Sequence, residues 1–165
     1  MSVHERIKPI ADVNYSCTVN ERGNVMRRMA EYTAVFAVGA VGYALIELLW
    51  RGRTHWTMML TGGVCMAFIY HTEKRYCDAP RWKRCLADTE MISLCELAVG
   101  FFVNILLDWH VWDYSSLPFN IFGQICPLYA FLWFMLCMPA TYMCTAMQKY
   151  ILRRRTDAAS ETSAL

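Results

Sequence analysis

The stretch "MISLCELAVGFFVNILLDW", residues 91–109, decides the fold. It has nineteen residues, and only Glu96 and Asp108 among them are charged. A helix of about 20 mostly apolar residues is long enough to cross the hydrocarbon core of a bilayer. The whole chain has the same character, because 56% of its 165 residues are hydrophobic and 18% are charged, against roughly 25% charged residues in soluble domains. The sequence therefore predicts an integral membrane protein.

Three further apolar runs lie outward from this stretch, at residues 32–50, 56–72 and 123–151. The run at 56–72 is short for a span, and the last run exceeds one. None of them alternates as a strand would. We therefore expect an all-α bundle of four transmembrane helices over residues 32–151, with an N-terminal tail at 1–31 and a C-terminal tail at 152–165. The polar tail before the first run argues against a secretory signal peptide, which would start closer to the N-terminus.

The basic residues predict an orientation for this bundle. Fourteen of the sixteen lie in the two tails and in the loop between the second and third runs, whereas Arg51 and Arg53 follow the first run. Cytoplasmic loops accumulate Lys and Arg. We therefore expect both termini and the middle loop on the cytoplasmic side of the cell membrane, with the middle loop close to anionic lipid headgroups or a cytoplasmic partner.

The loop "HVWDYSSLPFNIFGQICP", residues 110–127, contains no lysine or arginine. This fits the translocated side of the membrane, and its aromatic residues are typical of an interfacial belt. Asp113 and Ser115 can bond nearby backbone amides and fix a turn. We expect Asp113, Tyr114 and Ser115 to form an ordered external cap. The cap would place Asp113 near Asn104, Asp108 and the start of the fourth span, where Asn120 and Gln124 could meet it.

Four features resemble a known family. They are Gly42-x4-Glu47, Glu96-x3-Gly100, "VWDYS" at 111–115 and "LPFNIFGQICPLYAFLW" at 117–133. Together, over residues 41–133, they resemble the ABC-transporter type IV (CmpB-like) permease family, whose animal relatives are the transmembrane protein 229 group. The resemblance implies a permease-like subunit. The chain has no G-x4-GK[ST] loop, so an ATPase would be a separate polypeptide.

Two carboxylates lie within the predicted spans, Glu47 and Glu96. A charge there costs about 3 kcal/mol on insertion scales, so each side chain should face the bundle. Helical spacing places Glu47 on one face with small residues and Tyr43, and Glu96 on one face with Ser93, Gly100 and Asn104. Glu47 can also pair with Arg51 four residues on. Two interpretations stay open for both carboxylates, namely hydrogen bonds that fix the bundle and a functional site.

The two carboxylates should not act as a pair, because their axial offset is roughly 15 Å at 1.5 Å per residue. We expect an inner site at Glu96 and an outer polar layer near Glu47. The candidate binding residues are Glu47, Glu96, Asn104, Asp108, Asp113, Tyr114, Asn120 and Gln124. His71, Cys77 and Cys85 match no zinc spacing, so we expect neither a metal site nor another cofactor.

The sequence leaves three functions open. The first is a transport subunit, which would need a homo-oligomer because four helices mostly fill their own core. The second is a membrane enzyme or binding protein for lipid headgroups, and the third is a small scaffold. The sequence contains no nucleophile elbow, HExxH motif or dinucleotide loop, which favours a protein that is not an enzyme. The expected partners are the bilayer and an ATPase subunit, and we expect no nucleic acid.

Overall fold

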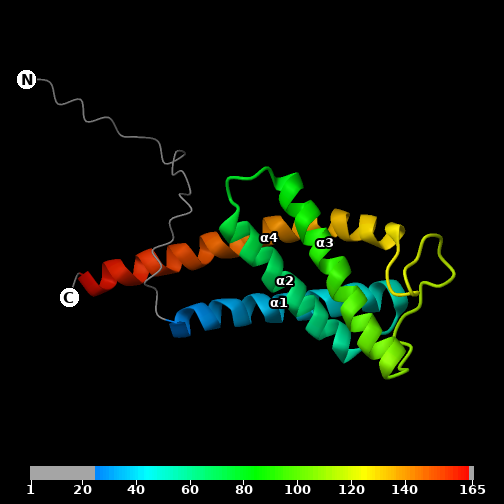
Figure 1. The fold of residues 1–165 in the computed structure, drawn as a ribbon. Helices are drawn as coiled ribbons and strands as arrows, with labels where there is room; N and C mark the ends of the chain where they lie inside the picture. The colour runs from blue at the N-terminus through cyan, green and yellow to red at the C-terminus, as the bar shows by residue number, and fades with distance from the viewer. Residues whose placement is uncertain (1–24, 164–165) are drawn as a thin grey trace, which may run out of the picture.

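The computed structural model describes residues 25–163, so most of the predicted N-terminal tail lies outside the described residues. Four α-helices follow one another: α1 (Val25–Arg51), α2 (Trp56–Arg75), α3 (Arg81–Gly100) and α4 (Pro127–Ser163) (Figure 1). α3 continues directly into a short π-helix, η2 (Phe101–Leu106). Over residues 25–163 there is no strand, only one isolated bridge between Ile121 and Ile125. The predicted all-α class is confirmed.

Three stretches are long and apolar enough to cross a membrane by length and composition: Val25–Arg51, Arg81–Leu106 and Pro127–Arg154. These correspond to the first, third and fourth predicted spans, and they support the predicted membrane protein. α2 does not reach the same hydropathy, since its 20 residues include three threonines, Glu73, Lys74 and Arg75. The described helices thus give three candidate spans.

α2 lies at the centre of the bundle, where it packs against α1, α3 and α4 (Figure 1). Its most extensive contact is with α1, and α3 packs against α4 as well. α1 and α4 do not pack closely against each other. Because neighbouring helices cover α2, its polar residues need not face lipid.

Glycines bring α1 and α2 into close contact. A Cβ atom added at Gly39 would lie 2.3 Å from the Cβ of Met66, and one at Gly62 would lie 2.3 Å from the Cβ of Tyr43. At Gly63 an added Cβ would lie 2.6 Å from the ring of Phe36. Small residues that let two backbones approach are typical of helix contacts in membranes. The face of the first predicted span that carries small residues and Tyr43 thus packs closely against α2.

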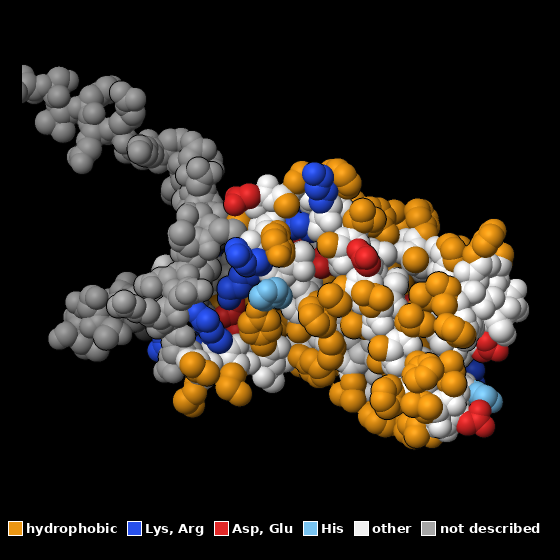
Figure 2. All heavy atoms as spheres, viewed as in Figure 1, with side chains coloured by type: hydrophobic (Ala, Val, Ile, Leu, Met, Phe, Trp, Pro, Cys, Tyr) orange, Lys and Arg blue, Asp and Glu red, His pale blue; other side chains and the backbone are white. Residues whose placement is uncertain are grey.

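Hydrophobic side chains cover the middle of the molecule in Figure 2, and most Lys and Arg side chains in view lie toward one end. Such apolar surface is expected where lipid is the solvent. The interior holds a larger apolar cluster around Val35, Ile69 and Tyr70, and a smaller one around Trp112 and Tyr114 under the 110–127 loop. Cys85, Cys137 and Cys144 are fully buried free thiols in the larger cluster. They fill space as small hydrophobic side chains.

The middle basic segment is shorter as a loop than the sequence suggests. α2 continues to Arg75 and α3 begins at Arg81, so the connection covers only residues 76–80. Pro80 precedes the first turn of α3, a region where proline is compatible with a helix. Arg84, which we expected in the loop, is a buried helical residue. Hydropathy marks where a helix can contact lipid, and these two helices extend beyond that zone.

Candidate functional site

Glu96 lies near the C-terminal end of α3 and is only 2% exposed. Its Oε2 atom accepts a hydrogen bond of 2.7 Å from the indole Nε1 of Trp133 on α4. Its Oε1 atom is buried and has no hydrogen-bond partner among the described residues. The expectation that Glu96 faces the bundle and bonds a neighbouring helix is confirmed. A carboxylate with one unsatisfied oxygen is costly in an apolar interior.

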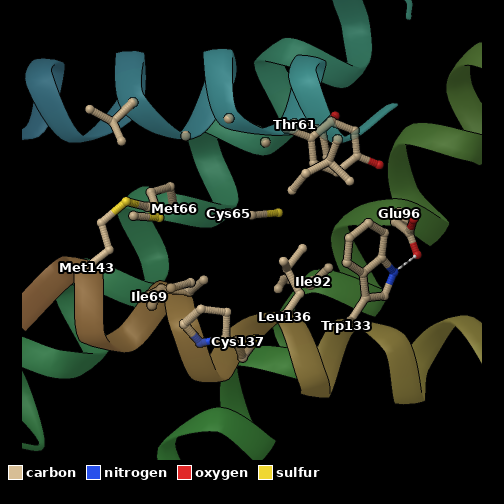
Figure 3. A pocket seen from close by; sticks show the side chains of 18 residues that line it. Thr61, Cys65, Met66, Ile69, Ile92, Glu96, Trp133, Leu136, Cys137 and Met143 are labelled. Atoms are coloured by element: carbon tan, nitrogen blue, oxygen red, sulfur yellow. Dashed lines mark hydrogen bonds between the residues drawn. The ribbon is translucent and has the colours of Figure 1, made fainter. Parts of the chain in front are cut away.

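This carboxylate borders a cavity of about 210 Å³. In Figure 3 the cavity lies between α1 and α4, with Glu96 and Trp133 at one end and Met143 towards the other. Tyr43 of α1 stacks on Trp133 with ring centroids 5.7 Å apart. Beyond this aromatic pair lies a second cavity of about 200 Å³, which Glu47 borders. The two cavities are neighbours, because both are lined by Tyr43, Ile46, Trp133 and Leu136.

Glu47 is buried near the end of α1 and has its own partners. Arg51 Nη1 lies 3.4 Å from Glu47 Oε1, and Thr54 Oγ1 donates to Oε2 at 2.7 Å. The predicted pairing of Glu47 with Arg51 is confirmed. Arg51 also donates to the carbonyl of Val111 at 3.5 Å, which ties this end of α1 to the 110–127 loop. The charge of Glu47 is therefore compensated by the protein itself.

The π-helix η2 positions Asn104 for a network with the loop. Asn104 Nδ2 donates to the Trp112 carbonyl at 2.9 Å and to Gln124 Oε1 at 2.7 Å, while Oδ1 accepts from the Val111 amide at 2.7 Å. An added Cβ at Gly100 would lie 2.3 Å from Gln124 Oε1. Gly100 of the Glu96-x3-Gly100 pattern thus makes room for this network. π-Helical turns occur often at functional sites, but here the turn serves the docking of the loop.

The loop itself is held by short-range hydrogen bonds. Asp113 accepts from the Ser115 amide at 2.8 Å and from the Ser115 hydroxyl at 2.9 Å. These bonds lower the pKa of the exposed Asp113 carboxyl below its ordinary value. Asn120 Nδ2 donates to the carbonyls of Leu117 and Ser115 at 2.7 and 3.1 Å. Tyr114 is buried and stacks on Tyr129 with centroids 4.2 Å apart. The loop thus has the turn that we expected at Asp113.

The structure does not gather the predicted outer residues into one layer. Asn104 contacts Gln124, whereas Asp113 and Asn120 bond within their own turns. Asp108 is exposed, and its Oδ1 lies 3.3 Å from Nε2 of the exposed His110. Asp108 has a positive φ of 54°, which directs the chain away from the helix after η2. Single-sequence spacing places residues on a helical face, but it does not reveal where a π-helical turn or a left-handed residue rotates that face.

A second group of buried charges was not predicted from the sequence. Arg84 Nε lies 3.0 Å from Glu73 Oε1, and both side chains are less than 10% exposed. Arg84 Nη1 also donates to the carbonyls of Tyr76 and Cys77 at 3.1 and 2.9 Å. Thr145 of α4 donates to Glu73 Oε2 at 3.2 Å. The group joins α2, α3 and α4 at the end of the bundle that carries the middle basic segment.

Two neighbouring carboxylates extend this group. Asp88 lies one turn after Arg84 and is 2% exposed. Glu31 of α1 is buried, where Lys74 Nζ lies 2.9 Å from its Oε1 and the Tyr70 hydroxyl donates to it. The available signal was the spacing of Arg84 and Asp88 at i and i+4, which places opposite charges on one helical face. Assigning Arg84 to a loop concealed that signal.

A family model described as "Putative ABC-transporter type IV" matches residues 15–164, almost the whole chain. No curated protein and no solved structure gives a significant match. The family predicted from the four sequence features is therefore confirmed. The predicted relation to the transmembrane protein 229 group stays a prediction.

Proposed function

We propose, because the chain belongs to the ABC-transporter type IV family, that it is a permease-like membrane subunit whose ATPase is a separate polypeptide. One observation carries the proposal beyond the family description. Glu96 is a buried carboxylate with one unsatisfied oxygen, and it borders the cavity between α1 and α4. Ionisable residues inside membrane bundles mark substrate or ion pathways by default.

We further propose a homo-oligomer. The described helices enclose an apolar cluster with fully buried members such as Val35, Tyr70 and Cys144. Because side chains fill the centre of the bundle, a transport pathway would have to form at its surface, between two copies of the chain. The cleft between α1 and α4 opens on such a surface, since these two helices do not pack closely together.

The external loop favours a structural cap over a headgroup site. Asp113 uses both carboxylate oxygens within its own turn, on the amide and the hydroxyl of Ser115. Tyr114 is buried against Tyr129. These side chains hold the loop onto the bundle, so an enzyme that acts on lipid headgroups is the weaker candidate.

The proposed topology has four crossings and both termini in the cytoplasm. α2 would cross as the central helix, because α1, α3 and α4 surround it and its polar groups then face protein. Reporter fusions placed after Arg53 and after Tyr114 should read as external, and a fusion after Ala79 should read as cytoplasmic. If α2 does not cross, the fusions after Arg53 and Ala79 will report the same side. That result would contradict the four-crossing arrangement.

The transport role is tested on the full-length chain purified from its own membranes in mild detergent. We expect a complex in a fixed ratio with a second polypeptide that carries a G-x4-GK[ST] motif, identified by mass spectrometry. We also expect vanadate-sensitive ATPase activity in the complex, absent from a mock purification of the untagged chain. A chain that elutes as a monomer without ATPase activity would contradict both the transport role and the homo-oligomer.

A further inference from the structure

The cavity between α1 and α4 is almost wholly apolar. Its walls include Val38, Ile46 and Met66, and it extends past Pro139 to Met143 (Figure 3). Among the residues that line it, Glu96 is the only carboxylic acid, and none is a lysine, arginine or histidine. The other ionisable groups are the weakly acidic Tyr43 and two cysteines. Small-molecule sites commonly combine apolar walls with a few placed polar groups. The cavity has that composition.

Glu96 gives this cavity a specific chemical requirement. Trp133 satisfies Oε2, and Oε1 has no donor among the described residues. The nearby cation Arg51 is bound to Glu47 and to the Val111 carbonyl. The carboxylate of Glu47 thus has a protein cation at hydrogen-bond distance, and that of Glu96 is bonded to a neutral indole. A donor from a ligand would satisfy Oε1, and a positively charged donor would also compensate the charge.

We propose that this cleft binds a hydrophobic molecule with a protonated amine, whose N–H donates to Glu96 Oε1 after a rotation of the side chain that brings this buried atom to the cleft, while the apolar part of the molecule lies between α1 and α4. The inference rests on the proposed transport role, for which it names the class of substrate. Charge complementarity excludes carboxylate and phosphate headgroups from contact with Glu96. A phospholipid amine is disfavoured for the same reason, because its phosphate would lie beside the amine with no basic residue among those that line the cavity.

The test uses the full-length chain in nanodiscs and three photoreactive amphiphiles: tetradecylamine, tetradecanol and tetradecanoate, each with the same mid-chain diazirine. We expect saturable labelling of α1 and α4 peptides by the amine, and at least about tenfold weaker labelling by the carboxylate. A tenfold change corresponds to about 1.4 kcal/mol, close to the lower limit for a hydrogen bond to a charged group. Equal labelling by the amine and the carboxylate would overturn the proposal without recourse to any variant.

Two variants locate the headgroup. Glu96→Gln keeps the shape of the side chain but removes its charge, and it should lower labelling by the amine about tenfold and leave labelling by the alcohol within twofold. Glu90→Gln is the matched control, because Glu90 is exposed on the same helix, and it should change neither. Unchanged labelling of Glu96→Gln by the amine would overturn the assignment of the headgroup.

A third variant locates the apolar part. A Cβ atom added at Gly42 meets nothing within 4 Å, and Gly42 lines the cavity. Gly42→Leu should therefore fill the cleft and abolish labelling by the amine and the alcohol. Persistent labelling of α1 and α4 would place the ligand elsewhere. Nanodiscs rich in phosphatidylethanolamine should not suppress labelling by the amine, and suppression would identify a lipid as the occupant instead.

Binding and transport can fail separately in these experiments. The labelling needs no ATPase, so labelling that depends on Glu96 in a chain without an ATPase partner would contradict only the transport role. A chain that forms the ATPase complex but shows no preference for the amine would contradict only the ligand class.

Discussion

Replacing Arg84 with methionine should destabilise the protein by about 3–5 kcal/mol, the cost of breaking a buried ion pair by removing one partner. Arg84 and Glu73 are both nearly fully buried, with Nε and Oε1 3.0 Å apart. Methionine fills similar volume but leaves Glu73 without its cation and two loop carbonyls without their donor. The fall in stability can be measured by thermal or denaturant unfolding in detergent.

The partner variant separates charge from packing. Glu73→Gln combined with Arg84→Met should recover a large part of the loss, because no uncompensated charge then remains at this pair. Lys83→Met is the matched control, since Lys83 is an exposed basic residue next to Arg84, and it should change stability by less than about 0.5 kcal/mol. If the double variant is as unstable as Arg84→Met alone, the pair does not account for the loss.

Substitution by alanine should have different effects on stability at two glycines of α1. Gly39→Ala should cost about 1–3 kcal/mol, the usual range for overpacking a close contact, because its Cβ would lie 2.3 Å from Met66 Cβ and 2.7 Å from the Gly62 carbonyl oxygen. Gly42→Ala meets nothing within 4 Å. It should be neutral or slightly stabilising, because alanine is the better helix former.

The prediction is checked by measuring the unfolding midpoints of Gly39→Ala and Gly42→Ala in the same detergent. A shared helix and a shared substitution remove differences in helix propensity, so the difference between them reports the contact between α1 and α2. Equal stabilities would mean that α1 and α2 do not pack as described. Gly62→Ala provides an independent check from α2, since its added Cβ would lie 2.3 Å from Tyr43 Cβ.

Hydropathy alone predicted the apolar helices, because a lipid-facing helix must be continuous and apolar. Helical spacing also placed Glu47 and Glu96 toward the bundle, and the i, i+4 rule found the contact of Glu47 with Arg51. These inferences depend only on the hydropathy and the helical spacing of residues within one segment of the chain. A single segment of sequence is therefore enough to make them.

The residues that were missed or misplaced depend on contacts between segments. Glu73 and Arg84 are charged residues close to a loop in the sequence, which suggests exposed side chains. The packing of α2 against α3 instead buries both side chains and brings them into contact. Asp108 shares a helical face with Asn104 only if the helix stays regular. The π-helix η2 and the left-handed conformation of Asp108 place the two apart. Likewise, the position of Trp133 on another helix decides which oxygen of Glu96 is hydrogen-bonded and which is unsatisfied.

Pro139 has a mechanical consequence for α4. The helix is about 55 Å long at 1.5 Å per residue, against roughly 30 Å of hydrocarbon. Proline removes one backbone hydrogen bond, so bending is easiest there. With Pro139 as pivot, Ser163 lies about 36 Å away on one arm and Trp133 about 9 Å away on the other. α4 then consists of a long arm and a short arm, in a length ratio of about four to one, joined at the point that bends most easily. A displacement of the far end should therefore bend the helix at Pro139 and leave Trp133 nearly in place, which pulsed distance measurements between spin labels on the two arms can check.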